Sequence, residues 1–520
     1  MSIKKHIVKA TIVILLFSVL GKLFGFAREI IIAAIFGTTS LTDAYFVGLS
    51  VPDFFREIIS GGILTAVFIP VYASFIQKNE SERSLKFINT ISTALALIMV
   101  LSVIVFMPLS GYLVKVFAPD LTEPAFSTAV TIAKIIFPAT IFMGIASFYG
   151  SLLNVHKHFV APALTQLMLN LGVIAGVIFL SKKLGVYSLA VGFVAGAVMQ
   201  LLVLFPSLRL RELSFKFTLQ WFSEFKPMFY LWGPLLFASV AGVGIDLVSR
   251  ALASGLDSGN IAALIFAGRI RETVWLFCGV PLGTAVFPFL SSVHAGNNSQ
   301  EFKKIVDFAI RITVLFALPF SLFTVIYSKP IISILFERGA FSSFSTEITS
   351  SALAFYSIGA LFYALNFVVI RIYYSRQDVI TPLKIFSIGF VLNLVAGFML
   401  RKYMLVGGVA LARSLTDAFC FIAMIIMLKP ILAEFKVWGV IKNILQILLI
   451  SIISLLPLYL VYISIHLPAG LFEKLVFLSV AVFFSVFIYL LLCKLFKVKE
   501  LDSIYNLLKR KIFPAGVLPQ

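Results

Sequence analysis

The sequence predicts an all-α protein that crosses a membrane many times, and three features of the chain support this prediction. First, 60% of the 520 residues are hydrophobic and only 12% are charged, which is about half the charged fraction of a typical soluble domain. Second, apolar stretches of about 20 residues recur from end to end, and each is long enough to cross the hydrocarbon core as a helix. Third, the sequence lacks the alternation over about 10 residues that is typical of a transmembrane β-barrel strand.

About fourteen transmembrane helices are predicted from these apolar stretches. Proline or glycine interrupts the second, seventh and eighth stretches, so we expect these helices to be kinked. No small-x-small cleavage site follows the basic and apolar start of the chain, which is therefore expected to remain as the first helix. The predicted helices cover residues 8–36, 42–76, 87–110, 125–153, 159–181, 186–206, 227–254, 260–292, 304–327, 346–374, 380–400, 405–428, 438–465 and 470–496.

The basic residues lie mostly between the apolar stretches and predict the orientation of the helices. With the N-terminus in the cytoplasm, about 25 Lys and Arg residues fall in cytoplasmic connections and about 8 in external ones, as the positive-inside rule requires. Both termini are therefore predicted to be cytoplasmic. Membrane topology and attraction to anionic lipid headgroups account for the net charge of +19, so nucleic acid is not an expected partner.

Two sequence segments recur at an offset of about 220 residues, as in transporters built from internal repeats. The segment "TAVFIPVYASF" (65–75) returns as "TAVFPFLSSV" (284–293), and Pro162 returns as Pro382 within a weaker match. The repeat predicts two six-helix lobes, related by a pseudo-twofold axis along the membrane normal, with a site between them. Two C-terminal helices follow the second lobe.

The repeat also predicts the division of the chain into regions. The predicted regions are an N-terminal lobe (1–206), a cytoplasmic linker (207–226), a C-terminal lobe (227–430), the two last helices (431–497) and a basic cytoplasmic tail (498–520).

The three cysteines, Cys278, Cys420 and Cys493, lie in or beside apolar stretches and are expected to be packing residues, so neither a disulfide nor a metal site is predicted.

Charged residues within the apolar stretches are the candidate functional residues, because an ionisable group in hydrocarbon is costly unless it lines a cavity or finds a partner. On a helix, the partner of a cation can lie three or four residues away. Ion pairs that stabilise the helix bundle are the simplest interpretation of such spacings. The predicted pairs are Arg56–Asp53, Arg250–Asp246, Arg269–Glu272, Arg311–Asp307 and Arg413–Asp417.

Arg28, Lys22 and Arg271 have no acidic residue at these spacings. Glu29 follows Arg28 directly and is expected to point to a different side of the helix. Two interpretations of Arg28 stay open. It could pair with an acid of another helix, for which the candidates are Asp43, Asp53 and Glu57. Alternatively, it could line an anion-binding cavity beside Gly21 and Gly25, which share its side of the helix and leave room for a ligand or a neighbouring helix.

The second predicted helix combines a break with charged residues. Pro52 interrupts the helix, and Asp53, Arg56 and Glu57 follow on the next turn. Arg28, Arg56 and Arg269 could converge where the two halves meet. Because arginine binds phosphate through a bidentate fork and stays charged, such a cavity would suit a diphosphate group.

Four ordered segments give the chain a specific resemblance to a known family. They are "GKLFGFAREIIIAAIFGTTSLTDAYFVGLSVPDFFREI", "FAGRIRETVWLFCGVPLGTAVFPFLSS", "LFERGAFSS" and "YYSRQDVITPLKI". These segments resemble the MurJ/MviN family of lipid II flippases, within the multidrug/oligosaccharidyl-lipid/polysaccharide exporter superfamily. The resemblance implies a transporter of the bacterial inner membrane that moves the undecaprenyl-diphosphate-linked peptidoglycan precursor from the cytoplasmic to the periplasmic leaflet.

The resemblance also implies roles for individual residues. Family cavity arginines fall on Arg28, Arg56 and Arg269, a further basic position falls on Lys22, and an acidic position falls on Asp43. The last two helices would form a groove for the polyprenyl tail. Acids close to these arginines are gating or ion-pair candidates, namely Glu29, Asp53, Glu57 and Glu272.

Coupling and partners follow from the resemblance as expectations. Some superfamily members bind sodium, and Asp246 and Asn393 are candidate oxygen ligands, although Arg413 would repel a nearby cation. Sodium, protons or the membrane potential are the candidate energy sources, and no other cofactor is expected. Lipid II, membrane lipids and cell-wall synthesis proteins are the expected partners.

Three other functions would need different residues or leave the same ones in place. A flippase for another polyprenyl-diphosphate oligosaccharide, of the O-antigen type, would keep the cationic cavity. A cation-coupled drug exporter would need acids and aromatic residues for its substrates, in place of a group of arginines. An intramembrane transferase would need an acidic metal site or a general base, and neither a DxD-like pair nor a His/Asp group is found in the sequence, so no enzyme is predicted.

Overall fold

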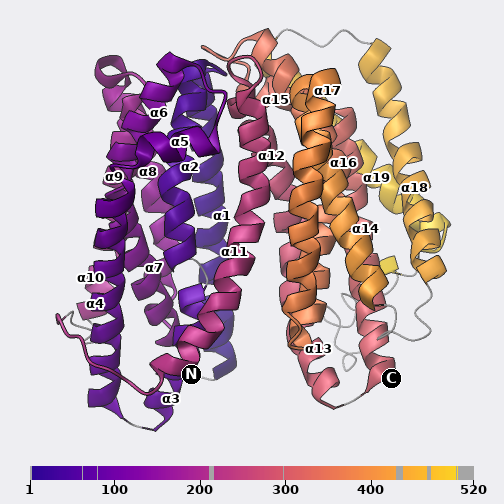
Figure 1. Cartoon of the computed structure of the whole chain (residues 1–520). Helices are drawn as coiled ribbons and strands as arrows, with labels where there is room; N and C mark the ends of the chain where they lie inside the picture. The colour runs from indigo at the N-terminus through magenta and orange to yellow at the C-terminus, as the bar shows by residue number, and fades with distance from the viewer. Residues whose placement is uncertain are drawn as a thin grey trace. The chain divides into compact units, whose positions relative to one another are not determined.

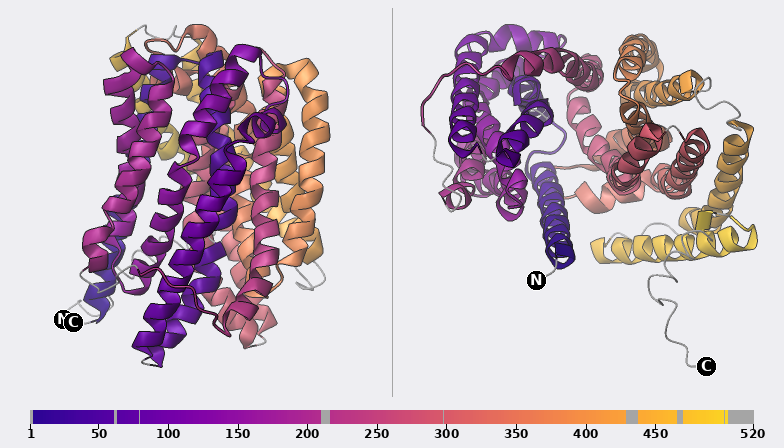
Figure 2. Two further views of the ribbon diagram at one scale, coloured as in Figure 1. Left: turned by 60° about the vertical axis from the view of Figure 1, so that its left-hand side comes forward. Right: turned by 90° about the horizontal axis from the view of Figure 1, so that it is seen from below.

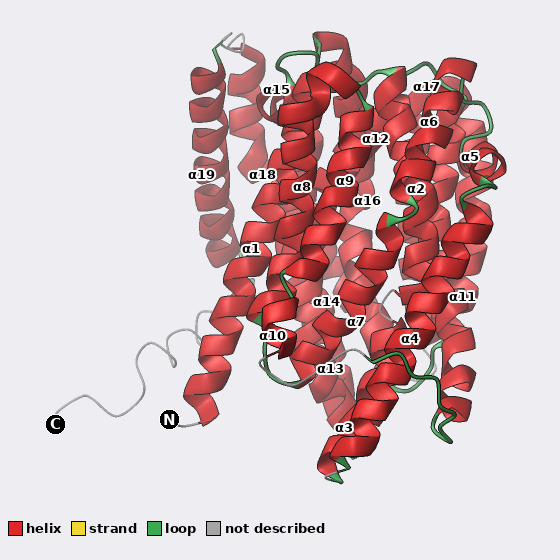
Figure 3. Ribbon diagram, turned by 90° about the vertical axis from the view of Figure 1, so that its left-hand side faces the viewer, coloured by secondary structure: helices red, strands yellow, loops and turns green. Residues whose placement is uncertain are grey.

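The computed structural model describes residues 3–60, 63–78, 80–209, 216–296, 298–428, 437–464, 470–498 and 500–501. All regular structure in these residues is helical (Figures 1 and 3). The chain forms two compact units, Met1–Ala262 with Arg338–Ser345, and Ala263–Glu337 with Thr346–Gln520. The predicted all-α class is therefore confirmed.

The first unit holds the helices up to α11 and the start of α12. They are α1 (Ile3–Phe36), α2 (Ser40–Ser60), α3 (Ile63–Gln77), α4 (Ser81–Phe106), α5 (Ser110–Phe117), α6 (Glu123–Ile136), α7 (Ala139–Val155), α8 (Val160–Leu184), α9 (Tyr187–Leu202), α10 (Phe205–Arg209), α11 (Phe225–Ser254) and α12 (Asn260–Val274). The second unit continues with the π-helix η1 (Trp275–Gly279), α13 (Val280–Ala295), α14 (Ser299–Ile326), α15 (Ser328–Phe336), α16 (Ser343–Ser375), α17 (Ile380–Leu428), α18 (Val437–Ser464) and α19 (Leu471–Leu495).

Every predicted apolar stretch falls on a helix, although several stretches are divided. By length and composition, nine helices of the described residues can cross a membrane, or ten if the pair α6 and α7, bent by 45°, is one span. The predicted count of fourteen therefore stays a prediction. The bend lies at Pro138, which cannot donate a backbone hydrogen bond. The predicted interruption at Pro52 is wrong, because α2 runs from Ser40 to Ser60 with Pro52 inside it, and a proline can be accommodated in a membrane helix when its neighbours satisfy the freed carbonyl. Gly61 and Gly62 lie outside the described residues.

The other predicted interruptions have mixed outcomes. The eighth stretch contains η1, and Pro281 lies two residues after its end, so the backbone pattern changes close to a residue that lacks a donor. The seventh stretch forms the continuous helix α11. The eleventh and twelfth stretches run together as α17, which turns at Leu405 with a φ of 50°.

The backbone carries the predicted internal repeat. Lys157 and Gln377 both have a φ of 60°, while Gly185 and Leu405 have φ values of 53° and 50°. Both pairs are separated by about 220 residues, the offset found in the sequence. The short helices α5 and α15 also occupy corresponding places in the two halves, although neither was predicted. The structure thus supports the repeat independently of side-chain similarity.

One helix packs outside the region that the repeat assigns to it. The sequence repeat places α11 in the C-terminal lobe, whereas its contacts with α2, α3 and α5 place it in the first unit. Within that unit, Arg250 of α11 donates a hydrogen bond to the Ser50 hydroxyl of α2. The division of the chain by contacts therefore differs from its division by repeat.

Small residues and aromatic rings explain the packing of the first unit. A Cβ on Gly172 of α8 would lie 2.3 Å from the Cα of Gly196 of α9, so these two helices, adjacent in Figure 3, approach through glycines as membrane helices commonly do. Phe68 is fully buried, and its ring centroid lies 5.7 Å from that of Phe87 and 4.8 Å from that of Phe148.

The two last helices pack on the second unit and against each other, as the yellow segments of Figure 2 show. The Tyr489 hydroxyl of α19 donates a 2.7 Å hydrogen bond to the Leu315 carbonyl of α14. Large apolar side chains such as Phe483 (67% exposed) cover the outer side of α19. This surface suits lipid, because large apolar side chains make up most of it and the charged residues Glu473 and Lys494 lie near the two ends of α19.

Candidate functional site

Arg28 lies on α1 in a buried polar contact with α8. Its Nη1 donates to the Asn170 Oδ1 over 3.1 Å, and its Nη2 lies 2.5 Å from the Glu29 Oε1. The side chains of Arg28 and Glu29 are 12% and 2% exposed. The expectation that Glu29 points away from Arg28 is therefore wrong, because a buried carboxylate needs a counter-ion and the long arginine side chain can reach it.

The glycines beside Arg28 allow α8 to approach α1. The Asn170 Nδ2 donates to the Gly21 carbonyl over 3.1 Å, and a Cβ on Gly25 would lie 3.5 Å from the same nitrogen. This agrees with the predicted close approach of a second helix at these glycines. Lys22 is exposed on α1, one position after Gly21.

Arg56 lies on α2 between two carboxylates. Its Nε is 2.8 Å from the Asp53 Oδ1, and its Nη2 is 3.0 Å from the Glu57 Oε2. The pairing of Arg56 with Asp53 at a spacing of three residues confirms the prediction from the sequence. Because both acids are partly exposed, Arg56 can release them in favour of an anionic ligand at a lower cost than it could release buried acids.

Asp43 is buried at the start of α2 and binds the backbone of another helix. Its Oδ2 accepts a 2.6 Å hydrogen bond from the Gly259 amide, and its Oδ1 accepts a 2.7 Å bond from the Ala262 amide. The carboxylate thus caps the N-terminus of α12, where a negative charge is favourable. In this structure both oxygens are used in that contact, in place of the predicted contact with a headgroup.

A second contact next to Asp43 joins the α1–α2 turn to the segment 338–345. The Ala340 amide donates to the Ala34 carbonyl over 2.8 Å, and Gly339 has a φ of 59°. A Cβ on Gly339 would lie 2.2 Å from the Ala34 carbonyl oxygen, so both the conformation and the close approach require glycine. Sequence reasoning missed this junction, although the segment "LFERGAFSS" contains Gly339.

Arg269 lies on α12 in the second unit. Its Nη1 donates to the Glu272 Oε2 over 3.2 Å, and the two side chains are 40% and 38% exposed. This pair confirms the predicted spacing of three residues. Arg28 and Arg56 belong to the first unit, so the convergence of the three arginines stays a prediction.

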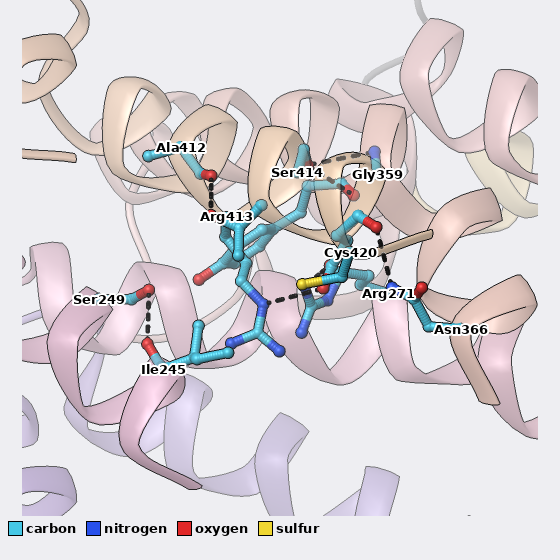
Figure 4. Close-up of polar contacts among 12 residues, drawn as sticks. Ile245, Ser249, Arg271, Gly359, Asn366, Ala412, Arg413, Ser414 and Cys420 are labelled. Carbon is cyan, nitrogen blue, oxygen red and sulfur yellow. Dashed lines mark hydrogen bonds and ion pairs between the residues drawn. The ribbon is translucent and has the colours of Figure 1, made fainter. Parts of the chain in front are cut away.

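A buried charge cluster lies in the second unit (Figure 4). Arg271 donates to the Asp417 Oδ2 over 3.2 Å, and the Arg413 Nε lies 3.4 Å from the Asp417 Oδ1. The Arg271 guanidinium also lies over the rings of Tyr356 and Tyr363, at 4.7 and 4.5 Å from their centroids. The sequence showed only that α12 offers Arg271 no acid three or four residues away, because its partners come from α16 and α17 and spacing along α12 cannot reveal them.

Two further predicted pairs are confirmed and one candidate site stays open. Arg311 lies 2.7 Å from Asp307, and Arg413 pairs with Asp417 as stated above. Asp246 is exposed in the first unit and Asn393 is buried in the second. Among the residues that the structure describes, no group of three His, Cys, Asp or Glu side chains could hold a metal ion, so the sodium site at Asp246 and Asn393 stays a prediction.

The sequence is similar to a family of known transporters over most of its length. The profile described as lipid II flippase MurJ matches residues 32–483. The lipid II flippase MurJ of Burkholderia cenocepacia is 30% identical over 379 residues, covering 71% of this chain and 73% of that protein. The probable lipid II flippase MurJ of Thermotoga maritima is 27% identical over 501 residues, covering 96% and 98% of the two chains.

Solved structures agree on the fold. A structure of lipid II flippase MurJ in an inward closed conformation matches with a TM-score of 0.78 at 24% identity, covering 94% of this chain and 99% of that one. An inward-facing multidrug resistance MATE transporter of the MOP superfamily matches with a TM-score of 0.63 at 15% identity, covering 83% and 98%. The family profile, which spans most of the chain, settles the membership: the chain belongs to the lipid II flippase MurJ family.

Proposed function

We propose that this multi-pass membrane protein flips lipid II, the undecaprenyl-diphosphate-linked disaccharide-pentapeptide, from the cytoplasmic to the periplasmic leaflet. The observation that carries this proposal is the family match over residues 32–483. The protein acts as a transporter and not as an enzyme. It works by alternating access, in which the headgroup crosses through the protein while the polyprenyl tail stays in lipid.

In this proposal, Arg28, Arg56 and Arg269 bind the diphosphate of the headgroup. Each of them contacts at least one carboxylate in the structure, so the diphosphate must exchange with that carboxylate when it binds. Such an exchange is favourable because a diphosphate offers several charged oxygens to the planar arginine fork. Lys22 adds a cation on the exposed side of α1.

The carboxylates have a role of their own in this mechanism. Glu29, Asp53, Glu57 and Glu272 hold the arginines in place while no headgroup is bound. This pairing lowers the cost of keeping cations inside a membrane protein. We further propose that Asp43 keeps α12 joined to α2 in the conformation described here, because its carboxylate accepts two backbone bonds from that helix.

The remaining features of the proposal concern the membrane. The distribution of basic residues supports a protein of the bacterial cytoplasmic membrane with both termini in the cytoplasm. The exposed apolar surface of α18 and α19 supports a binding groove for the polyprenyl tail. The membrane potential, worth about 2.3 kcal/mol per charge and 100 mV, is one candidate energy source, and sodium at Asp246 and Asn393 or protons are the others. Proteins of cell-wall synthesis are the predicted partners.

Binding and rescue experiments test this function together. Purified protein in nanodiscs should bind lipid II more tightly than undecaprenol, and a set of undecaprenyl diphosphates with other glycans should rank below lipid II. In cells depleted of their own flippase, Arg28→Ala, Arg56→Ala and Arg269→Ala should insert normally but fail to restore growth. Equal affinity for undecaprenol, or growth with all three variants, would contradict the proposal.

A further inference from the structure

The helix α12 has two clearly different sides. Buried residues of its second half include Ala267, Ile270, Arg271 and Val274, each at most 5% exposed. Arg269 and Glu272, by contrast, are 40% and 38% exposed. Residues two positions apart on a helix point in directions that differ by about 200°, so Arg271 faces the interior of the second unit when Arg269 faces away from it.

The exposed side of α12 is open next to Arg269. A Cβ on Gly268 would meet no atom within 4 Å. Arg269 thus lies beside open space on α12 and is itself 40% exposed, whereas Arg271 on the buried side packs against the rings of Tyr356 and Tyr363. The two arginines are close in sequence but differ in what they can bind.

Arg271 is an unusual residue for a buried helix side that is otherwise made of Ala, Ile and Val. A buried ion pair rarely stabilises a protein more than a well-packed apolar residue of the same size, because both charges must be desolvated. The contacts of Arg271 are strongly directional, however. The Asp417 carboxylate fixes one edge of the guanidinium, while Tyr356 and Tyr363 fix its plane. Such contacts define the rotation of α12 about its axis more sharply than apolar packing would.

The position of this contact along α12 is also important. The π-helix η1 begins four residues after Arg271, at Trp275, and a π-helical turn interrupts the regular hydrogen-bond pattern of the helix. The side of α12 that faces the second unit therefore does not follow the phase of α13, because the π-helical turn changes the number of residues per turn between them. A fixed contact at Arg271 supplies the missing constraint.

We propose that Arg271 is a positioning residue for headgroup binding: its buried contacts with α16 and α17 fix the rotation of α12, so that Arg269 and Glu272 face the open side. The inference rests on the proposed function, in which Arg269 binds the diphosphate. Arg271 itself touches no substrate and acts through Arg269.

A double-mutant cycle on lipid II binding tests this role, because residues that act through one another are not additive. Arg269→Ala and Arg271→Met should each raise the dissociation constant about tenfold, and the double variant should be no weaker than Arg269→Ala alone. Arg311→Met is the matched control, since it removes another arginine ion pair of the second unit that does not contact α12. It should leave lipid II binding unchanged.

A chemical measurement checks the geometry without any substrate. In an Arg269→Cys variant, a charged thiol reagent should label position 269 readily, and adding Arg271→Met should slow the labelling several-fold. The three native cysteines are buried. If Arg271→Met does not accumulate, Tyr363→Leu removes one face of the aromatic contact, and Tyr363→Phe is its control because it keeps the ring.

The outcomes separate the inference from the function. Normal lipid II binding by Arg271→Met, additive losses in the double variant, or unchanged labelling of position 269 would each overturn the positioning role and leave the proposed function intact. Normal binding by Arg269→Ala would instead overturn the assignment of Arg269 to the headgroup site. Loss of binding by Arg271→Met only in the presence of Arg269, with slower labelling, supports the positioning role.

Discussion

Replacement of Glu29 by glutamine should lower the stability of the substrate-free protein and raise its affinity for lipid II. The Glu29 carboxylate lies 2.5 Å from the Arg28 guanidinium and is 2% exposed. Glutamine keeps the size of the side chain but removes the charge, so the cation loses its charged partner and keeps a neutral contact with Asn170. Breaking a buried ion pair costs about 3–5 kcal/mol, and we expect about 3 kcal/mol here because that neutral contact remains.

The same change should lower the dissociation constant of lipid II. In the wild-type protein a diphosphate that binds Arg28 must separate it from Glu29, and in Glu29→Gln this cost is removed. If only half of the 3 kcal/mol is regained on binding, the dissociation constant of lipid II falls about tenfold. Tighter binding also slows release, so Glu29→Gln should restore growth of depleted cells less well than the wild type.

Thermal unfolding with and without lipid II measures both effects. The empty Glu29→Gln protein should melt at a lower temperature, and saturating lipid II should raise that temperature by more than it does for the wild type. Glu82→Gln is the matched control, because it makes the same charge change at an exposed ion pair with Lys86. Exposed ion pairs contribute little to the free energy of unfolding. An unchanged melting temperature together with unchanged or weaker lipid II affinity would refute the exchange of counter-ions at Arg28.

Other predictions concern the junction around α12 and the buried cluster. Gly339→Ala should lower the melting temperature, since its Cβ would lie 2.2 Å from a carbonyl oxygen at a φ of 59°. Gly111→Ala, with open space around it, should not lower the melting temperature, because Gly111 lies in the helix α5 and alanine favours a helix over glycine. Asp43→Ala should destabilise the protein by about 1–2 kcal/mol through loss of the α12 cap, and an unchanged melting temperature would contradict that role. Asp417→Asn should cost about 3 kcal/mol or more, because two buried guanidinium groups lose their charged partner, and unfolding at the wild-type temperature would exclude this.

The helical fold could be predicted because the length and hydropathy of a membrane helix are local properties of the sequence. The divisions of the helices were harder to predict. The bend at Pro138 has a local cause, yet proline also occurs inside unbroken helices, as Pro319 does in α14. The short helix α5, with only eight residues, is below the length at which periodicity is informative.

The ion pairs within one helix could be predicted, and those between helices could not. The spacing of Arg311 and Asp307 encodes their contact, because residues four apart share one side of a helix. Arg271 and Asp417 are separated by 146 positions, and only the folded structure brings them together. Arg28 and Glu29 are a third case, in which the spacing rule failed because a long side chain can bridge to a direct neighbour.

The ion pairs at the candidate site give its arginines counter-ions within the protein before any substrate binds. Three cations of the first unit, Lys22, Arg28 and Arg56, stand against three acids, while the fourth acid of the candidate site, Asp43, is stabilised by the backbone amides at the start of α12. The acids are Glu29, Asp53 and Glu57. A carrier with unbalanced cations would move charge through the membrane field whenever it reset without substrate, at about 2.3 kcal/mol per charge and 100 mV.

With balanced pairs, the empty carrier should reset without sensing the membrane potential, and the potential should act only on the anionic substrate. This predicts that an imposed potassium diffusion potential leaves the orientation of the empty wild-type carrier unchanged in liposomes. The orientation can be measured by thiol labelling of a Leu23→Cys variant, since Leu23 is exposed on α1. Adding Glu29→Gln leaves one uncompensated cation and should make the labelling voltage-dependent, because that charge then moves with the reset. Equal voltage dependence with and without Glu29→Gln would show that these pairs do not balance the charge of the moving site.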